Sequence, residues 1–430
     1  MKERYAIALT GLAGLMVGVA VPGMAYAQEV TLSLLTTNSP QALLRAEQYA
    51  ADFMAANPDI AIEIETRPGG SEGDNLVKTR LATGVMNDIF MYNTGSLLRA
   101  INPERTLVDL SAEPFMERIL DEFLPVVSSG DGIYGVPAET VRGGGIVYNR
   151  AIYEQLDLEV PKTWDEFMAN NQAILDSGIA VPVIQSYRDT WTSQLLVLGD
   201  FYNVQAEVPG FAEAYTRNQA KFATTPAALK GFERLEAVHA AGYLNPDFGA
   251  AGYTDALRML ANGEGAHYPM LTQAFGAIAD AYPDKLDDIG FFAQPGDDPE
   301  KNGLTIWLPN AYYIPQTSAH IEEAKRFLDF VASAEGCAAD LAALGPTGPY
   351  LVEGCTLPED VPPAVSDLAS YIGEGGSSAP ALEFLSPIKG PSLEQITVEV
   401  GSGIRSAAAG AALYDEDVRK QAQQLAIEGW

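Results

Sequence analysis

The chain has 430 residues, and its 57 aspartates and glutamates outnumber its 26 lysines and arginines, which gives a formal net charge of −31 at pH 7. This acidity disfavours nucleic acid and anionic lipid as partners, because both would be repelled by such a surface. The length is too great for one compact core and fits two domains of ordinary size. Three scattered histidines and two cysteines show no metal-ligand spacing, and we expect no cofactor.

The first 27 residues have the pattern of a secretory signal peptide. Lys2 and Arg4 precede an apolar run over residues 6–21, and the sequence Ala-Tyr-Ala at 25–27 matches a cleavage site. The apolar run is shorter than the roughly 20 residues that a membrane-spanning helix needs. No cysteine follows it to carry a lipid anchor. We therefore expect a mature chain that starts at Gln28 and is soluble in a periplasm or outside the cell.

Apolar periodicity predicts alternating strands and helices at the start of the mature chain. The expected elements are a strand at 30–36, a helix at 41–56, a strand at 60–66, a helix at 74–83, a strand at 88–92 and a helix at 95–101. Such alternation implies a mostly parallel sheet with helices on both faces. A ligand crevice would then lie beyond the carboxyl ends of the strands.

Residues 131–164 read as backbone that crosses between two bodies. Pro137 lacks a ladder donor, so it belongs at a strand end or edge. Three consecutive glycines at 143–145 would free the backbone where the two bodies pivot. Thr163 and Glu166 have the spacing of a capping box, which starts a helix there.

A second group of alternating elements follows this crossing. Helices are expected at 164–176, 190–202, 225–240 and 254–262, around strands at 181–185 and 289–293. This alternation predicts a second α/β lobe.

The crossing segment resembles the hinge region of the extracellular solute-binding proteins that serve sugar ABC importers. The resemblance is carried by the runs YGVP at 134–137, YNR at 148–150 and PKTWDE at 161–166, in the family's order and spacing. It extends to NPDI at 57–60, LATG at 81–84, the stretch 263–275 and PIKGP at 387–391. The resemblance therefore covers nearly all of the mature chain.

The resemblance implies the two-lobe (type II) periplasmic binding protein fold, in which each lobe is a mostly parallel sheet flanked by helices and the ligand lies in the interlobe cleft. Residues 311–315 and 321–332 would return the chain to the first lobe, and 345–349 would make the last crossing. The first lobe would comprise residues 28–141 and 309–346, and the second lobe residues 142–308 and 347–430.

A sugar presents hydroxyl groups and a flat apolar face, so its site needs aromatic surfaces together with polar side chains. Candidate ligand contacts lie where strands or crossings end: Asn38, Ser39, Glu72, Tyr92, Asn93, Arg142, Tyr187, Asp189, Trp191, Thr272, Gln273, Trp307, Asn310 and Tyr312. Each residue also has a purely structural interpretation. Trp191 could belong to the core face of its helix, and Ser39 and Asp189 could be helix caps.

Trp307 is the best single candidate, because it stands at a predicted crossing and not on an amphipathic stripe. Gln273 occupies the position where the family usually carries a ligand-stacking tryptophan, which argues against a maltose-like stacked disaccharide. Arg142 is the one basic residue among the candidates, so a neutral sugar or polyol is favoured over a sugar acid or phosphate. ABC importer permease subunits are the implied protein partners, and we expect a monomer.

Cys337 and Cys355 are the two cysteines of the chain. In an oxidising compartment a disulfide between them is the natural expectation, and two free buried thiols are the alternative.

A secreted ester hydrolase or carbohydrate-active enzyme is the competing functional class. The run GGSEG at 69–73 matches the G-x-S-x-G pattern after a predicted strand. However, Pro68 breaks that strand before the turn. His239, His267 and His320 do not lie in loops that follow a candidate acid, and no carboxylate pair is singled out. We therefore expect a binding protein and not an enzyme.

Overall fold

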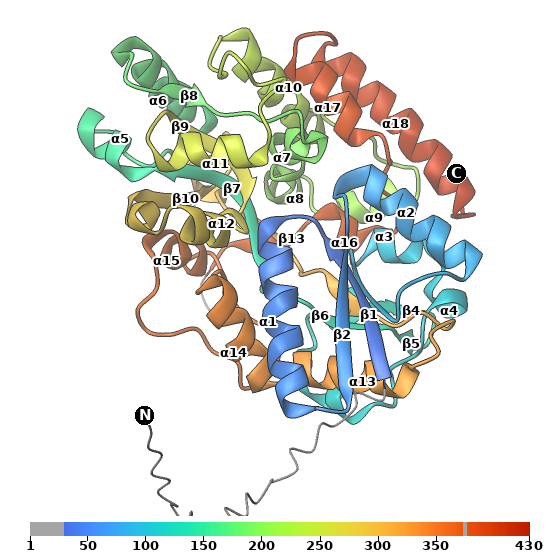
Figure 1. The fold of residues 1–430 in the computed structure, drawn as a ribbon. Coiled ribbons are helices and arrows are strands. Elements are labelled where there is room, and N and C mark those ends of the chain that lie inside the picture. Colours follow the sequence, from blue (N-terminus) through green and yellow to red (C-terminus); the bar gives the residue numbers. More distant parts are fainter. Residues whose placement is uncertain (1–29, 373–375) are drawn as a thin grey trace, which may run out of the picture.

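Two β-sheets, each covered by helices, form the centres of two lobes in the computed structural model (Figure 1). The structure describes residues 30–372 and 376–430, so the predicted signal peptide at 1–27 lies outside the described residues. The chain crosses between the lobes in the segments 138–141 and 308–310 and again after residue 344.

The first sheet has the strand order β2-β1-β3-β12-β6. Its strands are β1 (Val30–Thr37), β2 (Ile60–Arg67), β3 (Ile89–Tyr92), β6 (Gly135–Pro137) and β12 (Ala311–Tyr313). Strand β1 pairs in parallel with β2 and β3, whereas β12 runs antiparallel to β3 and β6. The helices of this lobe are α1 (Pro40–Ala56), α2 (Gly70–Thr83), α3 (Ser96–Arg99), α4 (Pro103–Thr106), α13 (Ile321–Val331) and α14 (Ala334–Leu344), and β4 (Ser128–Ser129) pairs with β5 (Gly132–Ile133).

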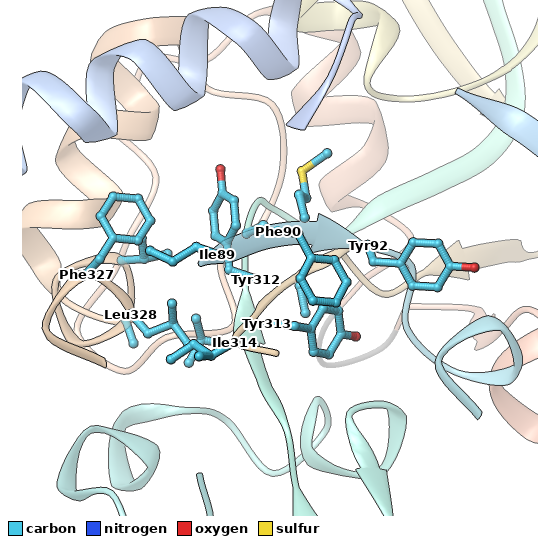
Figure 2. Close-up of a cluster of buried hydrophobic side chains, with 14 of the residues drawn as sticks. Ile89, Phe90, Tyr92, Tyr312, Tyr313, Ile314, Phe327 and Leu328 are labelled. Atoms are coloured by element: carbon cyan, nitrogen blue, oxygen red, sulfur yellow. The ribbon is translucent and has the colours of Figure 1, made fainter. Parts of the chain in front are cut away.

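Buried aromatic and aliphatic side chains join β3 and β12 to α13 in the core of the first lobe (Figure 2). Phe90 and Tyr313 pack with ring centroids 5.6 Å apart, and Tyr312 meets Phe327 of α13 edge to face at 5.8 Å. The β-α-β start is as predicted, and β12 and α13, which fall in the predicted returning segments 311–315 and 321–332, pack in this lobe.

The second sheet has the order β13-β11-β7-β9-β8, and β10 also pairs with β7. Its strands are β7 (Arg142–Asn149), β8 (Val181–Val183), β9 (Gly265–Leu271), β10 (Ile289–Ala293), β11 (Leu304–Trp307) and β13 (Ser378–Pro380). This sheet is mixed and not mostly parallel as expected, because β7, which enters from the first lobe, runs antiparallel to β9, β10 and β11. The α/β class and the two lobes are confirmed.

Helices cover both faces of the second sheet. They are α5 (Arg150–Leu156), α6 (Trp164–Ser177), α7 (Leu195–Leu198), α8 (Phe201–Glu207), α9 (Phe211–Thr216), α10 (Pro226–Ala240), α11 (Tyr253–Ala261), α12 (Ala274–Ala281), α15 (Pro363–Ala369), α16 (Leu382–Leu385), α17 (Leu393–Gly401) and α18 (Ala407–Gln424). The predicted capping box at the start of α6 is present, with Thr163 and Glu166 satisfying each other's backbone N–H groups. Within the described residues, no helix combines the length and apolarity needed to cross a bilayer.

The single helix predicted at 190–202 is broken into a 3-10 turn (Thr190–Gln194), α7 and α8. Thr305 of β11 causes the break. Its hydroxyl donates a hydrogen bond to the Gly199 carbonyl at 2.7 Å and accepts one from the Tyr202 N–H at 2.8 Å. A tertiary contact therefore replaces the helical hydrogen bonds at this point, which no local pattern could reveal.

The glycines at 143–145 lie inside β7 and do not form the expected pivot. A Cβ at Gly144 would sit 2.1 Å from Cζ3 of Trp307, and one at Gly145 would sit 2.5 Å from the carbonyl oxygen of Phe292. Strand β7 is paired on both edges, so its backbone is held and not free. These glycines are needed for close packing.

The crossings lie beside one another. The Ala138 N–H donates to the Asn310 carbonyl at 2.9 Å, and the Val141 N–H donates to the Pro349 carbonyl at 2.8 Å. After α14 the chain does not leave the first lobe at once, because Leu351 and Val352 pack in its core, beyond the boundary predicted at residue 346. The assignment of every residue to a lobe stays a prediction.

A disulfide joins Cys337 of α14 to Cys355, with their Cα atoms 6.1 Å apart. It ties the segment after α14 back to the first lobe.

We expect thiol titration of the unfolded, unreduced protein to find no free thiol, whereas two titrating thiols would contradict the pairing. Replacing both cysteines by serine should lower the free energy of unfolding by about 3 kcal/mol, because an 18-residue loop is released in the unfolded chain. Guanidinium unfolding of both proteins measures this difference.

Candidate ligand-binding cleft

A cavity of about 680 Å³ lies between the lobes and is lined from both of them. The first lobe contributes the turn between β1 and α1, the start of α2 and the end of β3. The second lobe contributes the loop after β8, the starts of α11 and α12, and residues around α16 and α17. The crossing residues Glu139, Arg142 and Asn310 also line it. The volume is in the usual range for small-molecule sites.

The structure brings ten of the fourteen predicted contact residues to this cavity: Asn38, Ser39, Glu72, Asn93, Arg142, Asp189, Trp191, Gln273, Trp307 and Asn310. Two of them also have structural roles. Ser39 caps α1 by accepting a hydrogen bond from the Ala42 N–H at 3.3 Å. Asp189 accepts one from the Tyr253 N–H at 2.7 Å, which fixes the start of α11 against the loop after β8.

Tyr92 and Tyr312 are not among the residues that line the cavity, contrary to the prediction. Both are fully buried. Tyr312 packs against Phe327 in the first core, and the guanidinium of Arg67 lies over the ring of Tyr92 at 5.6 Å from its centroid. Alternate residues of a strand face opposite sides of its sheet, so residues at a strand end need not face the crevice beyond it.

Tyr187 and Thr272 also lie outside the cavity lining and within the second lobe. The ring of Tyr187 packs edge to face against Phe248 at 5.5 Å. The hydroxyl of Thr272 accepts a hydrogen bond from the Gly143 N–H at 3.0 Å and so completes the pairing of β7 with β9. The Tyr187 ring and the Thr272 hydroxyl thus both contact other residues of the second lobe.

Trp191 and Tyr253 form an aromatic pair in the cavity wall, with ring centroids 5.4 Å apart and planes tilted by 51°. Trp191 is half-buried, so part of its indole stays accessible. Trp307 is only 7 % exposed, and its Nε1 donates to Glu383 at 2.5 Å. Trp191 therefore offers a ligand more surface than Trp307, the stronger candidate from the sequence. Tyr253 was missed because it directly precedes an apolar helix pattern and carries no signal of its own.

The cavity lining holds more charge than the sequence suggested. Its basic residues are Arg45, Arg67, Arg142, Arg188 and Lys389, and its acidic residues are Glu72, Asp74, Glu139, Asp189, Glu383 and Glu394. Most of the cations are neutralised by carboxylates. Lys389 pairs with Glu383 at 2.7 Å, and Arg45 pairs with Glu139 at 2.9 Å. Arg142 is the one basic residue among the candidates from the sequence, and the cavity lining adds four more, yet the cleft has no excess of positive charge.

Three buried polar atoms of lining residues have no hydrogen-bond partner within the described part of the chain: Arg67 Nε, Gln194 Oε1 and Tyr253 Oη. An unsatisfied buried polar group costs about 1–3 kcal/mol, so such groups need a reason. Burial lowers the pKa of Arg67, although the nearby Asp74 carboxylate opposes this shift. Arg67 and Gln194 were missed because they lie in a strand and a turn with no distinguishing pattern.

Ser71 of the G-x-S-x-G run lies in the first turn of α2 and lines the cavity. None of the residues lining this cavity is a histidine, so Ser71 has no imidazole base beside it there. His267 belongs to β9 and is buried in the second lobe, where its Nδ1 lies 2.9 Å from both the Asn171 side chain and the Pro182 carbonyl. Its hydrogen bonds are structural.

The protonation of His267 should make stability depend on pH. Burial lowers the pKa of His267 to about 3, whereas its ordinary value is 6.5. The unfolded chain thus binds a proton that the folded chain excludes, so this residue's contribution to stability is present above pH 6.5 and is lost as the pH falls toward 3. Between pH 6 and pH 4 we expect a loss of up to about 1.4 kcal/mol per pH unit. Denaturant unfolding should show a shallower pH slope for His267→Gln. The partly exposed His239→Gln is the control, and equal slopes for all three proteins would contradict this assignment.

The two sheets, the three crossings and the cavity between the lobes define a two-lobe α/β binding protein. The family model for bacterial extracellular solute-binding proteins matches residues 37–336, and the chain belongs to this family. A multiple sugar-binding protein of Streptococcus mutans is 26% identical over 294 residues. That match covers 66% of this chain and 66% of the relative, slightly less than two thirds of the relative's length.

Solved structures share the whole fold. A chitin oligosaccharide binding protein matches with a TM-score of 0.80 at 21% identity, over 92% of this chain and 99% of that chain. The solute-binding protein RafE in complex with raffinose matches with a TM-score of 0.74 at 21% identity, over the same shares of the two chains. At these identities the likeness establishes the fold.

Proposed function

We propose that this protein captures a neutral sugar, from a monosaccharide to an oligosaccharide, or a polyol, and delivers it to the permease subunits of a membrane ABC importer. The observation that carries the proposal is the interlobe cavity, where the Trp191–Tyr253 pair stands beside charged groups that are mostly paired. An aromatic wall suits the apolar face of a sugar, and the unpaired atoms of Arg67, Gln194 and Tyr253 suit its hydroxyls.

The names of the similar proteins support a sugar as the class of ligand. The curated relative from Streptococcus mutans is called a multiple sugar-binding protein, and the two solved structures are described with chitin oligosaccharide and with raffinose. A sugar acid or phosphate would need several unpaired cations. The cleft pairs Arg45, Arg142 and Lys389 with carboxylates, and within the described residues Arg67 is a lining cation without an ion pair. This balance of charge favours a neutral ligand.

The mechanism is capture by closure. Sugar enters between the lobes, the lobes rotate about the crossings, and water leaves the cleft. Only a difference in affinity between the closed and open states can shift the population toward closure. The protein works as a soluble monomer in the periplasm or outside the cell after its signal peptide is removed, and no covalent step is required.

A thermal-shift screen tests the proposal. The panel contains neutral monosaccharides, raffinose, chitin oligosaccharides and polyols, with sugar acids and sugar phosphates as the charged comparison. A neutral saccharide or polyol should raise the melting temperature in a concentration-dependent way, because it binds the folded state alone. A response confined to the charged compounds would contradict neutral-sugar binding, and chromatography showing that the saccharide is cleaved would favour the hydrolase.

A further inference from the structure

Glu139 connects the first crossing to the second crossing and to both lobes. It lies in the segment 138–141 and is 7 % exposed. Its Oε2 accepts a hydrogen bond from Arg45 Nη1 of α1 at 2.9 Å. Its Oε1 accepts one from the Asn310 N–H of the second crossing at 3.3 Å and pairs with Arg142 at the start of β7. One buried carboxylate therefore touches the first lobe, the second lobe and two crossings.

Arg45 extends this connection to the segment after α14. Its Nε pairs with Asp340 of α14, and Asp340 Oδ2 accepts a hydrogen bond from the Tyr350 hydroxyl at 3.1 Å. Tyr350 follows Pro349, whose carbonyl is bonded to the Val141 N–H of the first crossing. We call Arg45, Glu139, Arg142, Asp340 and Tyr350 the hinge network. It links the first and second crossings to the segment that follows α14 in the first lobe.

The hinge network is balanced in charge, with two guanidinium groups and two carboxylates. Removing one carboxylate would leave Arg45 and Arg142 facing each other with half of their counter-charge. Burial, and then repulsion by the charge of Arg45, lowers the pKa of Arg142 to about 9. Breaking a buried pair on one side leaves an uncompensated charge, which is among the most destabilising single changes.

We propose that Glu139 is the positioning residue that couples occupation of the cleft to the angle between the lobes. Arg45, Glu139, Arg142 and Asn310 all line the cavity, and the same side chains hold the crossings together. A ligand that bonds to any of them acts on groups whose other bonds fix the crossings. This inference rests on the proposed function, since it takes the interlobe cavity to be the sugar site.

The test compares two variants of the hinge network with a control variant, in which a buried ion pair elsewhere in the protein is changed. Glu139→Gln keeps the shape of the side chain but removes its charge. Tyr350→Phe removes the hydroxyl that donates to Asp340 at 3.1 Å and to the Cys337 carbonyl at 3.3 Å. Tyr350 does not line the cavity, so this change cannot act by direct ligand contact. Asp200→Asn is the control, because Asp200 pairs with Arg234 inside the second lobe, is 1 % exposed and is not among the residues that line the cavity.

Interlobe distance is the readout that a merely structural role would not change. Val85 of the first lobe and Ile404 of the second are exposed, and the described residues contain no free cysteine, so Val85→Cys and Ile404→Cys provide specific labelling sites. Fluorophores are attached to these two cysteines, and resonance energy transfer between them reports the interlobe distance without ligand and with raffinose. We expect Glu139→Gln to give longer ligand-free distances and about tenfold weaker raffinose binding, because apparent affinity falls with the fraction of competent protein. Tyr350→Phe should change the ligand-free distance and the raffinose affinity in the same directions, but by smaller amounts.

Asp200→Asn should lower the melting temperature yet keep the wild-type distance and affinity. Wild-type distances in both Glu139→Gln and Tyr350→Phe would overturn the proposal. If Glu139→Gln does not fold, Tyr350→Phe decides alone, and an unchanged distance distribution overturns the proposal. Failure of raffinose to bind the wild type counts against raffinose as the ligand, whereas the ligand-free distances still decide the role of Glu139.

Discussion

Replacing Trp191 by alanine is expected to weaken the binding of a neutral saccharide by about thirtyfold, which corresponds to about 2 kcal/mol. The indole is half-buried in the cavity wall and packs against Tyr253, so a sugar ring that covers it buries apolar surface worth roughly 1.5–3 kcal/mol. Isothermal titration with the saccharide found by thermal shift measures the loss. Trp191→Phe, which keeps an aromatic face, should lose much less.

The substitution Trp307→Ala distinguishes the role of Trp307 from that of Trp191, the other tryptophan that lines the cleft. Because Trp307 is packed on Gly144 and bonded to Glu383, its removal should act mainly on stability. Wild-type affinity in Trp191→Ala together with a large loss in Trp307→Ala would reverse the assignment. Unchanged affinity in Trp307→Ala would remove that residue from the site.

Gly144→Ala is expected to lower the free energy of unfolding by about 2 kcal/mol, as overpacking of a core does. The added methyl group would lie 2.1 Å from Cζ3 of Trp307, so the indole must move and its hydrogen bond to Glu383 is disturbed. Glu383 also holds Lys389 in the cleft, so saccharide affinity should fall with stability.

Gly249→Ala is the matched control for this substitution. A Cβ there meets no atom within 4 Å, and the residue does not line the cavity. We expect denaturant unfolding of this variant to match the wild type within experimental error or to show a small gain, since alanine restricts the unfolded chain. If Gly144→Ala were equally harmless, the glycine run would be a source of flexibility and not a packing requirement.

The sequence was sufficient wherever local patterns decide the structure. The capping box at Thr163 and Glu166 and the first β-α-β unit follow from spacing and apolar period, and the structure contains both. The same reasoning failed at Gly144 because the residue that requires glycine there, Trp307, lies far along the chain. The break after Gly199 has the same origin, since Thr305 causes it from another element.

The candidate site was predicted in part for a similar physical reason. Residues that follow strands, such as Asn38 and Asn93, line the cavity because strand ends meet at one edge of a sheet, and their contact with a ligand stays a prediction. Tyr92 and Tyr312 were wrongly included, since position along a strand does not say which face a side chain takes. Arg67 was missed because its burial beside the cleft depends on the fold.

Equilibrium dialysis of the protein against the saccharide identified by thermal shift, followed by mass analysis of the recovered sugar, tests reversible capture most directly. The account predicts saturable binding of one equivalent, release on dilution and recovery of the sugar chemically intact. Absence of binding by every neutral saccharide and polyol, or recovery of a cleaved product, would contradict it.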